Sequence, residues 1–150
     1  MIPHRQQRAK GEEGVVLVEF ALVFALFVFI LYALIAFGTA LALKQSVTHA
    51  AAEGARAAVG VVDNPSTKYD ERVDTAMEEV AASLDWIGDK YSADDVDARI
   101  DSCSRAPTSG NCMFVTITYP YNDKPVVPNA PGLGVVMPDT MTSEAVVKID

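Results

Sequence analysis

The sequence predicts an α+β protein in which a long N-terminal membrane helix continues into a small head, with a second helix and a three-stranded, mostly antiparallel sheet. Three observations lead to this prediction. Residues 15–43 form an apolar run in which Glu19 is the only charge. Apolar residues then recur at helical spacing over residues 44–60 and 73–84. From residue 96 onward the period changes to two, which is typical of half-buried strands.

The apolar run is long enough to cross a membrane. Its roughly 29 residues would make a helix of about 43 Å, whereas the hydrocarbon core of a bilayer is about 30 Å thick. A carboxylate inside such a segment is unfavourable by about 2.5–3.5 kcal/mol at mid-membrane on the insertion scale measured for Asp, and by less near an interface. Anchoring alone does not need it. We therefore expect Glu19 to find a partner outside the monomer.

Charge is distributed unevenly along the chain, whose formal net charge is −8. Arg5, Arg8 and Lys10 precede the apolar run, whereas nine Lys/Arg and seventeen Asp/Glu follow it. A basic flank before the helix predicts an N-terminus in the cytoplasm and a head outside, in a single-pass protein of the cytoplasmic membrane. The acidic head also argues against binding to nucleic acid.

Four segments follow from these patterns: a leader over residues 1–14, a transmembrane helix over 15–43, an amphipathic continuation over 44–60 and an extracytoplasmic α+β head over 61–150. The expected helix begins at Val15. The buried stripe of the continuation consists of small residues, which let another backbone approach closely (Val47, Ala51, Gly54, Ala55 and Ala58).

The second helix is expected to begin with Asn64 as N-cap and Pro65 as its first residue, and to end near Gly88. Its apolar stripe consists of Val73, Met77, Val80 and Leu84, with Trp86 and Ile87 closing the core at its end. Three alternating segments then predict strands, around residues 96–100, 113–119 and 143–149. A Pro-rich loop precedes the last strand.

Cys103 and Cys112 are the only two cysteines, and they lie at the two ends of the loop between the first two strands. On the outer side of a membrane this pattern indicates one local disulfide, which would contribute about 2–3 kcal/mol. A zinc half-site is the alternative, but no His or further Cys lies near enough in the sequence to complete it.

Two motifs carry a family resemblance. Gly14, four apolar residues and then Glu19-Phe20 resemble the processing site of type IV prepilins and pseudopilins, which a prepilin peptidase cuts after the Gly. The Ala-rich stretch that contains Glu53, Gly54 and Arg56 resembles the TadE-like minor pseudopilins of the tight-adherence (Flp) pilus system. The β-rich end of the chain also fits that family.

The resemblance implies a pilin-like fold and a minor pseudopilin, a structural subunit and assembly factor that is processed between Gly14 and Val15. It further implies that Glu19 pairs with the new Val15 amine of a neighbouring subunit. The implied partners are the prepilin peptidase, the major pilin, companion pseudopilins, the membrane assembly platform and membrane lipid. A place in the pilus at the cell surface is compatible with it.

Three alternatives stay open. In the first, the helix is an uncleaved signal anchor and Gly14 is incidental. In the second, Ala40-Leu41-Ala42 is a signal peptidase site and the mature chain begins at Leu43, although the apolar core over residues 20–37 is longer than the usual 7–15 residues. In the third, the head is a membrane-anchored binding domain that never enters a filament.

No other side-chain set predicts chemistry. His49 and Glu53 lie four residues apart and could form half a metal site, but a solvated helix face explains them, and Glu53 with Arg56 suits a local pair or a filament contact. Asp94, Asp95, Asp97 and Asp101 lack the order of a calcium-binding EF-hand loop. No Ser/His/Asp or Cys/His set predicts a catalytic nucleophile together with its base. We therefore expect no enzyme activity, no cofactor, no metal and no small-molecule substrate.

Overall fold

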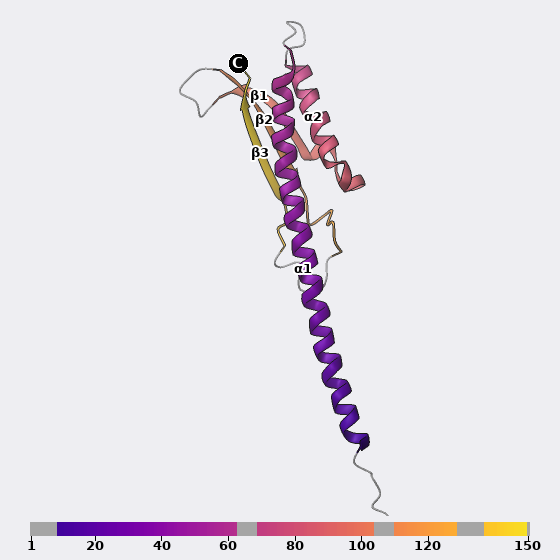
Figure 1. The fold of residues 1–150 in the computed structure, drawn as a ribbon. Helices are drawn as coiled ribbons and strands as arrows, with labels where there is room; N and C mark the ends of the chain where they lie inside the picture. Colours follow the sequence, from indigo (N-terminus) through magenta and orange to yellow (C-terminus); the bar gives the residue numbers. More distant parts are fainter. Residues whose placement is uncertain (1–8, 63–68, 104–109, 129–136, 150) are drawn as a thin grey trace, which may run out of the picture. The chain divides into compact units, whose positions relative to one another are not determined.

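The computed structural model describes residues 9–62, 69–103, 110–128 and 137–149, with side chains described from Gly14 onward. The chain divides into two units, Met1–Gly38 and Thr39–Asp150, and each is taken separately below. In chain order the elements are α1 (Ala9–Gly60), α2 (Asp70–Leu84), the 3₁₀ helices η1 (Asp85–Lys90) and η2 (Ala93–Asp95), and the strands β1 (Val96–Ser102), β2 (Asn111–Tyr119) and β3 (Met141–Lys148) (Figure 1).

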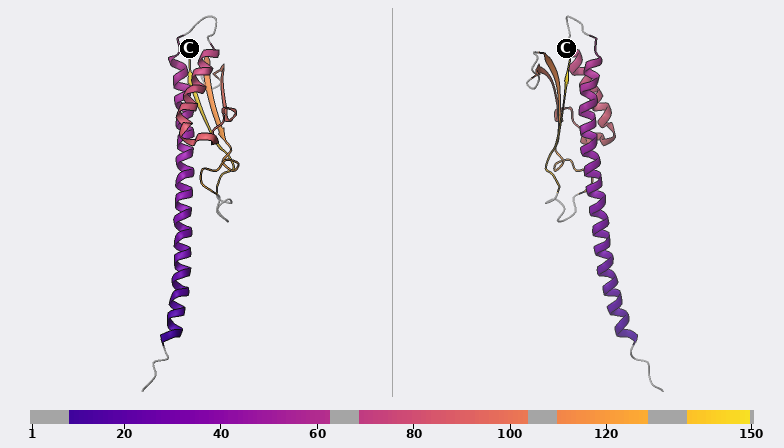
Figure 2. Two further views of the ribbon diagram at one scale, coloured as in Figure 1. Left: turned by 90° about the vertical axis from the view of Figure 1, so that its right-hand side faces the viewer. Right: turned by 60° about the vertical axis from the view of Figure 1, so that its left-hand side comes forward.

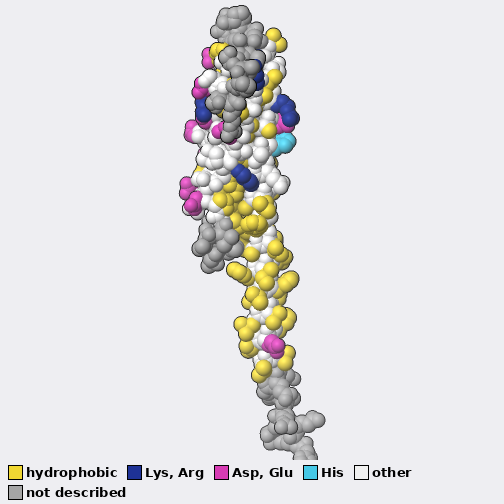
Figure 3. Space-filling model, turned by 90° about the vertical axis from the view of Figure 1, so that its left-hand side faces the viewer, with side chains coloured by type: hydrophobic (Ala, Val, Ile, Leu, Met, Phe, Trp, Pro, Cys, Tyr) yellow, Lys and Arg dark blue, Asp and Glu magenta, His cyan; other side chains and the backbone are white. Residues whose placement is uncertain are grey.

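The described part of the first unit is helix. Every large apolar side chain from Val15 to Leu31 is between 45% and 69% exposed. Hydrophobic side chains cover this stretch of helix in the space-filling view (Figure 3). Within the described residues, α1 is the one helix long and apolar enough to cross a membrane. An apolar surface on all sides suits lipid rather than water.

Helix α1 begins at Ala9, six residues before the expected start at Val15. Extending an existing helix needs no new nucleus, and Ala, Lys and Glu are good helix formers. The helix propensity of these residues outweighs the unfavourable propensity of Gly11 and Gly14. The helical backbone therefore runs through the Gly14–Val15 peptide bond. The expected end of this helix at Gly60 is confirmed.

The second unit is a small α+β head, as the sequence predicts. Its sheet has the order β1-β2-β3, and both strand pairs are antiparallel. The Thr39–Gly60 part of α1 and the whole of α2 lie on one face of this sheet (Figures 1 and 2). The fully buried core combines residues of both helices with the alternate residues of β2 (Leu43, Val47, Val80, Leu84, Met113, Val115, Ile117 and Tyr119).

Small residues bring α1 and α2 together. Ala50, Ala51 and Ala58 of α1 and Ala76 of α2 are fully buried. At Gly54 the two helices come so close that an added Cβ would lie 2.6 Å from Val80 Cγ2 and 2.9 Å from the carbonyl oxygen of Ala76. The predicted small-residue stripe is buried as expected, and at Gly54 the element that packs on it is α2.

A buried arginine closes the end of α1. Arg72 is only 4% exposed, and its Nη1 donates a hydrogen bond of 2.9 Å to the carbonyl oxygen of Ala58. The last four carbonyls of a helix lack partners within the helix and carry partial negative charge. A guanidinium at that position satisfies one of them and offsets the helix dipole.

Helix α2 differs from its prediction at its C-terminal end, and its expected N-cap is not among the described residues. It begins at Asp70, while Asn64 and Pro65 lie outside the described residues. It ends at Leu84 rather than Gly88, because η1 follows and Gly88 adopts a positive φ of 62°. Ile87 is buried as expected, but Trp86 is 55% exposed and does not close the core.

The buried face of α2 is also rotated from the prediction. Val80 and Leu84 are buried, whereas Val73 and Met77 are only half-buried. The fully covered stripe consists of Arg72, Ala76, Val80 and Leu84. The prediction placed the larger apolar residues Val73 and Met77 at the centre of the buried face. The close approach to α1 instead requires a small residue such as Ala76 there.

We predict that Gly54→Ala destabilises the head by about 1–3 kcal/mol, because the new methyl group overlaps the Ala76 backbone and cannot be relieved by a rotamer change. The measurement is thermal unfolding of the full chain in detergent micelles, followed by near-ultraviolet circular dichroism. Gly60→Ala is the matched control, since nothing lies within 4 Å of its added Cβ. Equal melting temperatures for the two variants would contradict the close approach.

We also predict that Arg72→Met lowers the free energy of unfolding by about 1–3 kcal/mol, because a buried carbonyl at the end of α1 loses its donor. The same unfolding experiment tests it. Arg56→Met is the control, because that side chain is 75% exposed and its ion pair should contribute less than about 1 kcal/mol. If Arg56→Met lowered the free energy of unfolding as much as Arg72→Met does, burial of the Arg72 side chain would not explain the effect.

Candidate processing and assembly site

The predicted processing site lies on a single face of α1 in the first unit. Gly14, Val15, Val18, Glu19 and Leu22 line one shallow depression on the helix surface. Residues three and four positions apart are neighbours on a helix, so the Glu19 side chain stands one turn beyond Val15. The helix thus places the carboxylate close to the backbone nitrogen that cleavage after Gly14 would release as an amine.

The carboxylate of Glu19 has an apolar neighbourhood. The depression that it shares contains no other ionisable side chain, and none of the side chains that the structure describes pairs with it. In hydrocarbon an unpaired carboxylate is unfavourable, so its free energy falls when a cation reaches it. A partner for Glu19 outside the monomer stays a prediction.

Phe20 adds an aromatic contact beside this face. Its ring stacks on that of Phe24, with centroids 5.9 Å apart and an interplanar angle of 18°. The pair sits at i and i+4, and Phe20 is 68% exposed. Two exposed stacked rings present a rigid apolar surface for lipid or for another helix.

The Glu53-Gly54-Arg56 motif in the second unit divides between two faces of α1. Gly54 turns toward α2, whereas Glu53 and Arg56 form a local ion pair with Nη1 3.0 Å from Oε1. His49 Nε2 lies 3.7 Å from the same carboxylate oxygen. The glycine therefore serves packing inside the head, and the charged pair faces outward. A filament contact through that pair stays a prediction.

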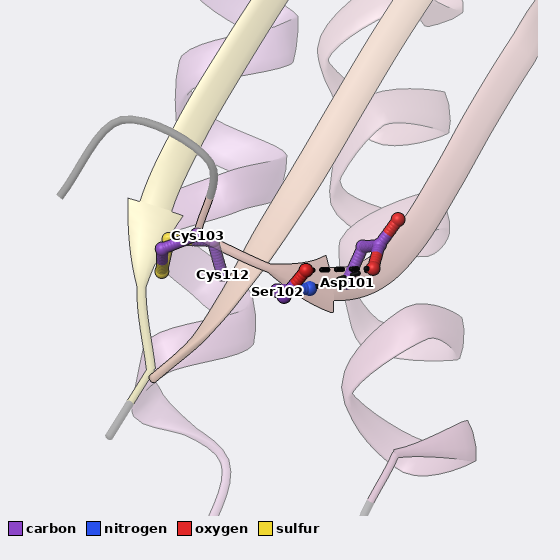
Figure 4. The surroundings of a disulfide bond; sticks show 4 residues. All are labelled: Asp101, Ser102, Cys103 and Cys112. Carbon is purple, nitrogen blue, oxygen red and sulfur yellow. Dashed lines mark hydrogen bonds between the residues drawn. A yellow bond between two sulfur atoms is a disulfide. The ribbon is translucent and has the colours of Figure 1, made fainter. Parts of the chain in front are cut away.

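The expected disulfide between Cys103 and Cys112 is present, with Cα atoms 5.1 Å apart, inside the usual range for such bonds. Cys103 N also donates a 3.1 Å hydrogen bond to the carbonyl oxygen of Gly110, which extends the β1–β2 hairpin beyond Ser102. Next to the bridge, Ser102 donates to the side chain of Asp101 (Figure 4). The bridge therefore fixes the ends of the connection between β1 and β2.

The acidic residues before and within β1 have partners other than a metal. Asp97 pairs with Arg99, and Asp95 Oδ2 lies 3.1 Å from Lys124 Nζ. Burial, and then the Asp95 carboxylate, raise the pKa of the hydroxyls of Tyr91 and Tyr119. In the described part of the chain, no group of three or more His, Cys, Asp or Glu side chains is placed to hold a metal ion.

Two structural contacts escaped the sequence reasoning. Arg72 could have been found, because with Ala76, Val80 and Leu84 it occupies one helical face at intervals of four. The pair between Asp95 and Lys124 left no such signal, because 29 residues separate its members. That pair joins η2 to the loop after β2, and Lys124 also accepts the Tyr119 hydroxyl on its carbonyl oxygen at 2.6 Å.

Comparison with known proteins adds one match. Residues 14–56 match the model of the family described as TadE-like protein. Neither a curated protein nor a solved structure is detectably similar to the chain. The matched segment begins at Gly14 and ends at Arg56, so it contains both motifs singled out in the sequence. Residues 14–56, less than half of the chain, are therefore similar to the TadE-like family, which is consistent with a TadE-like protein of the tight-adherence pilus system.

Proposed function

We propose that this protein is a minor pseudopilin, a structural subunit and assembly factor of a tight-adherence pilus, and that a prepilin peptidase removes residues 1–14. One observation carries the proposal. The TadE-like segment starts at Gly14, and five residues later it places Glu19 on an otherwise apolar, exposed helix. Membrane anchoring alone does not require that carboxylate, whereas a subunit that assembles could use it to pair with a neighbouring subunit.

Cleavage after Gly14 requires a local change in α1. The scissile bond lies within the helix, whose backbone groups are hydrogen-bonded to one another. A protease needs access to an extended backbone, so the first turns must unwind. Gly11 and Gly14 each weaken a helix by about 1 kcal/mol relative to Ala, which favours unwinding at this end of α1.

The cleaved chain would begin with the α-amine of Val15. A free amine and the Glu19 carboxylate each lose favourable hydration in lipid, and pairing them between subunits offsets that loss. Each subunit carries one amine and one carboxylate on the same face of its helix. If the amine of one subunit pairs with the carboxylate of the next, the pairs would therefore fix the axial register between the two helices.

The remaining partners follow from the same role. The membrane assembly platform would receive the processed subunit, and companion pseudopilins and the major pilin would contact its exposed apolar helix. The basic residues before the helix and the acidic head after it support a cytoplasmic N-terminus. Glu53 and Arg56 are available on the outer face of α1 for a contact between heads.

Gly14→Ala is predicted to leave the precursor uncut, because it stiffens the helix at the scissile bond and adds a methyl group beside it. The measurement is the intact mass and N-terminal sequence of protein extracted from membranes of cells that contain a prepilin peptidase. The wild-type chain should begin at Val15. Gly11→Ala is the control and should be processed, although more slowly.

Two outcomes of that experiment would contradict the proposal. A wild-type chain that retains residues 1–14 would favour the membrane-anchored binding domain. A chain that begins at Leu43 would show secretory cleavage and exclude a pilus subunit.

For Glu19→Gln we predict normal processing and membrane insertion but at least about a tenfold loss of incorporation into pili. The neutral amide leaves the Val15 amine of the neighbouring subunit without its counter-ion, and loss of one partner of a buried pair destabilises by about 3–5 kcal/mol. The measurement is the amount of subunit in sheared pilus fractions relative to the membrane. Glu79→Gln, on the exposed face of α2, is the control and should assemble like the wild type. Undiminished incorporation of Glu19→Gln would refute the pairing.

A further inference from the structure

We propose that the outer edge of β1 and the start of α2 form a groove that binds an extended, basic segment of another protein, which adds to the three-stranded sheet as a further strand. The inference rests on the second unit of the chain alone. It does not depend on cleavage after Gly14 or on entry into a filament.

The first step is the direction of the backbone groups of β1, which is an edge strand of the sheet. Cys103 N bonds to the carbonyl oxygen of Gly110, and this pair continues the β1–β2 register. Hydrogen-bonded and non-hydrogen-bonded pairs alternate in an antiparallel ladder, so every second residue before Cys103 also bonds to β2. The residues between them, including Ala98 and Ile100, therefore direct their N–H and C=O groups away from β2.

The opposite edge of the sheet, formed by β3, supports this reasoning and is in contact with α1. Ile149 N bonds to the carbonyl oxygen of Asn111, so the same alternation directs the Thr142 carbonyl away from β2. The ammonium group of Lys44 in α1 donates to that carbonyl. No described residue bonds in this way to the outward groups at the centre of β1.

The second step is the space beside these outward groups, an open groove of about 620 Å³. Its lining includes residues 98–102 of β1 and, around the start of α2, Tyr69, Asp70 and Val73. Val73, Ala98 and Ile100 are half-buried and pack against the core, so they give the groove a partly apolar floor.

The edge of β1 also lacks the features that keep a further strand away. Its register against β2 is continuous, and it contains neither a bulge nor a proline. An extended segment added to such an edge gains main-chain hydrogen bonds, and neighbouring pockets bind its alternate side chains. The groove between β1 and α2 therefore suits an extended polypeptide.

The third step is the charge of the groove, which favours a basic occupant. Asp70 and Asp101 line it and are exposed. Arg99 is the one basic residue among its described lining residues, and it is already paired with Asp97. A second copy of β1 would bring two Asp and one Arg, which is an excess of the same sign. Opposite charges stabilise neighbouring strands, so a segment rich in Lys or Arg fits better than a second copy.

The two faces of the sheet predict the pattern of this segment. Residues of the added strand that bond to Ala98 and Ile100 would place their side chains over the apolar floor, because directly opposed residues share a face. Their neighbours would lie on the other face, beside Asp97 and Asp101. The segment should therefore alternate apolar and basic residues.

The test uses a fluorescein-labelled heptapeptide of alternating lysine and valine, added to the full chain in micelles of a neutral detergent. We expect a rise in fluorescence anisotropy on binding. One control peptide carries N-methylated valines, which removes the donors that face β1 but keeps every charge. In a second control, glutamate replaces lysine. Each control should bind at least about tenfold more weakly, because binding needs both the hydrogen bonds and the cations.

Ala98→Pro is the protein variant that blocks the edge. The N–H that it removes points away from β2, so the β1–β2 ladder keeps its hydrogen bonds. We expect the affinity for the lysine–valine peptide to fall at least about tenfold. Val146→Pro is the matched control, because it removes an outward N–H from the β3 edge and should bind like the wild type. Near-ultraviolet circular dichroism checks that both variants keep the fold.

A charge variant tests the same groove without a proline. Asp70→Asn combined with Asp101→Asn keeps the acceptor that Ser102 N uses but removes two carboxylates from the lining. At low salt this variant should bind the lysine–valine peptide about three- to tenfold more weakly than the wild type.

Three outcomes would overturn the proposal. In the first, the lysine–valine peptide and its N-methylated form bind equally, so that charge alone explains binding. In the second, Ala98→Pro binds like the wild type, or no peptide binds at about 1 mM. In the third, the wild type self-associates, Ala98→Pro makes it monomeric and neither binds peptide, so that a second copy occupies the edge. Processing and pilus incorporation are measured separately, so a failure here is distinguishable from a failure of the proposed function.

Discussion

The close approach of α1 and α2 at Gly54 is the contact on which the head depends. It allows Ala76 and Val80 to reach the backbone of α1, and it sets the register in which Arg72 meets the carbonyl oxygen of Ala58. The level of η1 along α1 follows from the same register. A side chain at position 54 would separate the helices, so their packing and the closure of the end of α1 by Arg72 would change together.

The side chains of α1 differ in size between its two parts, as their different surroundings require. In the first unit large apolar side chains are exposed, which suits lipid, whereas in the second unit alanine and glycine are buried against α2. Small residues bury little apolar area, so they contribute less hydrophobic stabilisation per residue. The disulfide and the buried Arg72 add further constraints to the head.

The sequence predicted those parts of the fold that depend on local periodicity. The alternation in β2 and the small stripe of α1 match the observed burial because each depends on one element and its buried side. The rotation of α2 was predicted wrongly because it depends on how closely a second helix can approach. Asp95 and Lys124 could not be paired in advance, since only the folded chain brings them together. For the candidate site, the sequence predicted the positions of the motifs. It did not predict that the Gly14–Val15 bond is helical, because this depends on the extension of α1 into a polar leader.

Glu19 sets the balance between membrane and filament under the proposed function. An unpaired carboxylate raises the free energy of a membrane helix, and an amine supplied by another subunit would lower it. This term would favour assembly over storage in the membrane. Because it is small beside insertion of the whole apolar helix, it would not release the subunit alone, and extraction would need work from outside this chain.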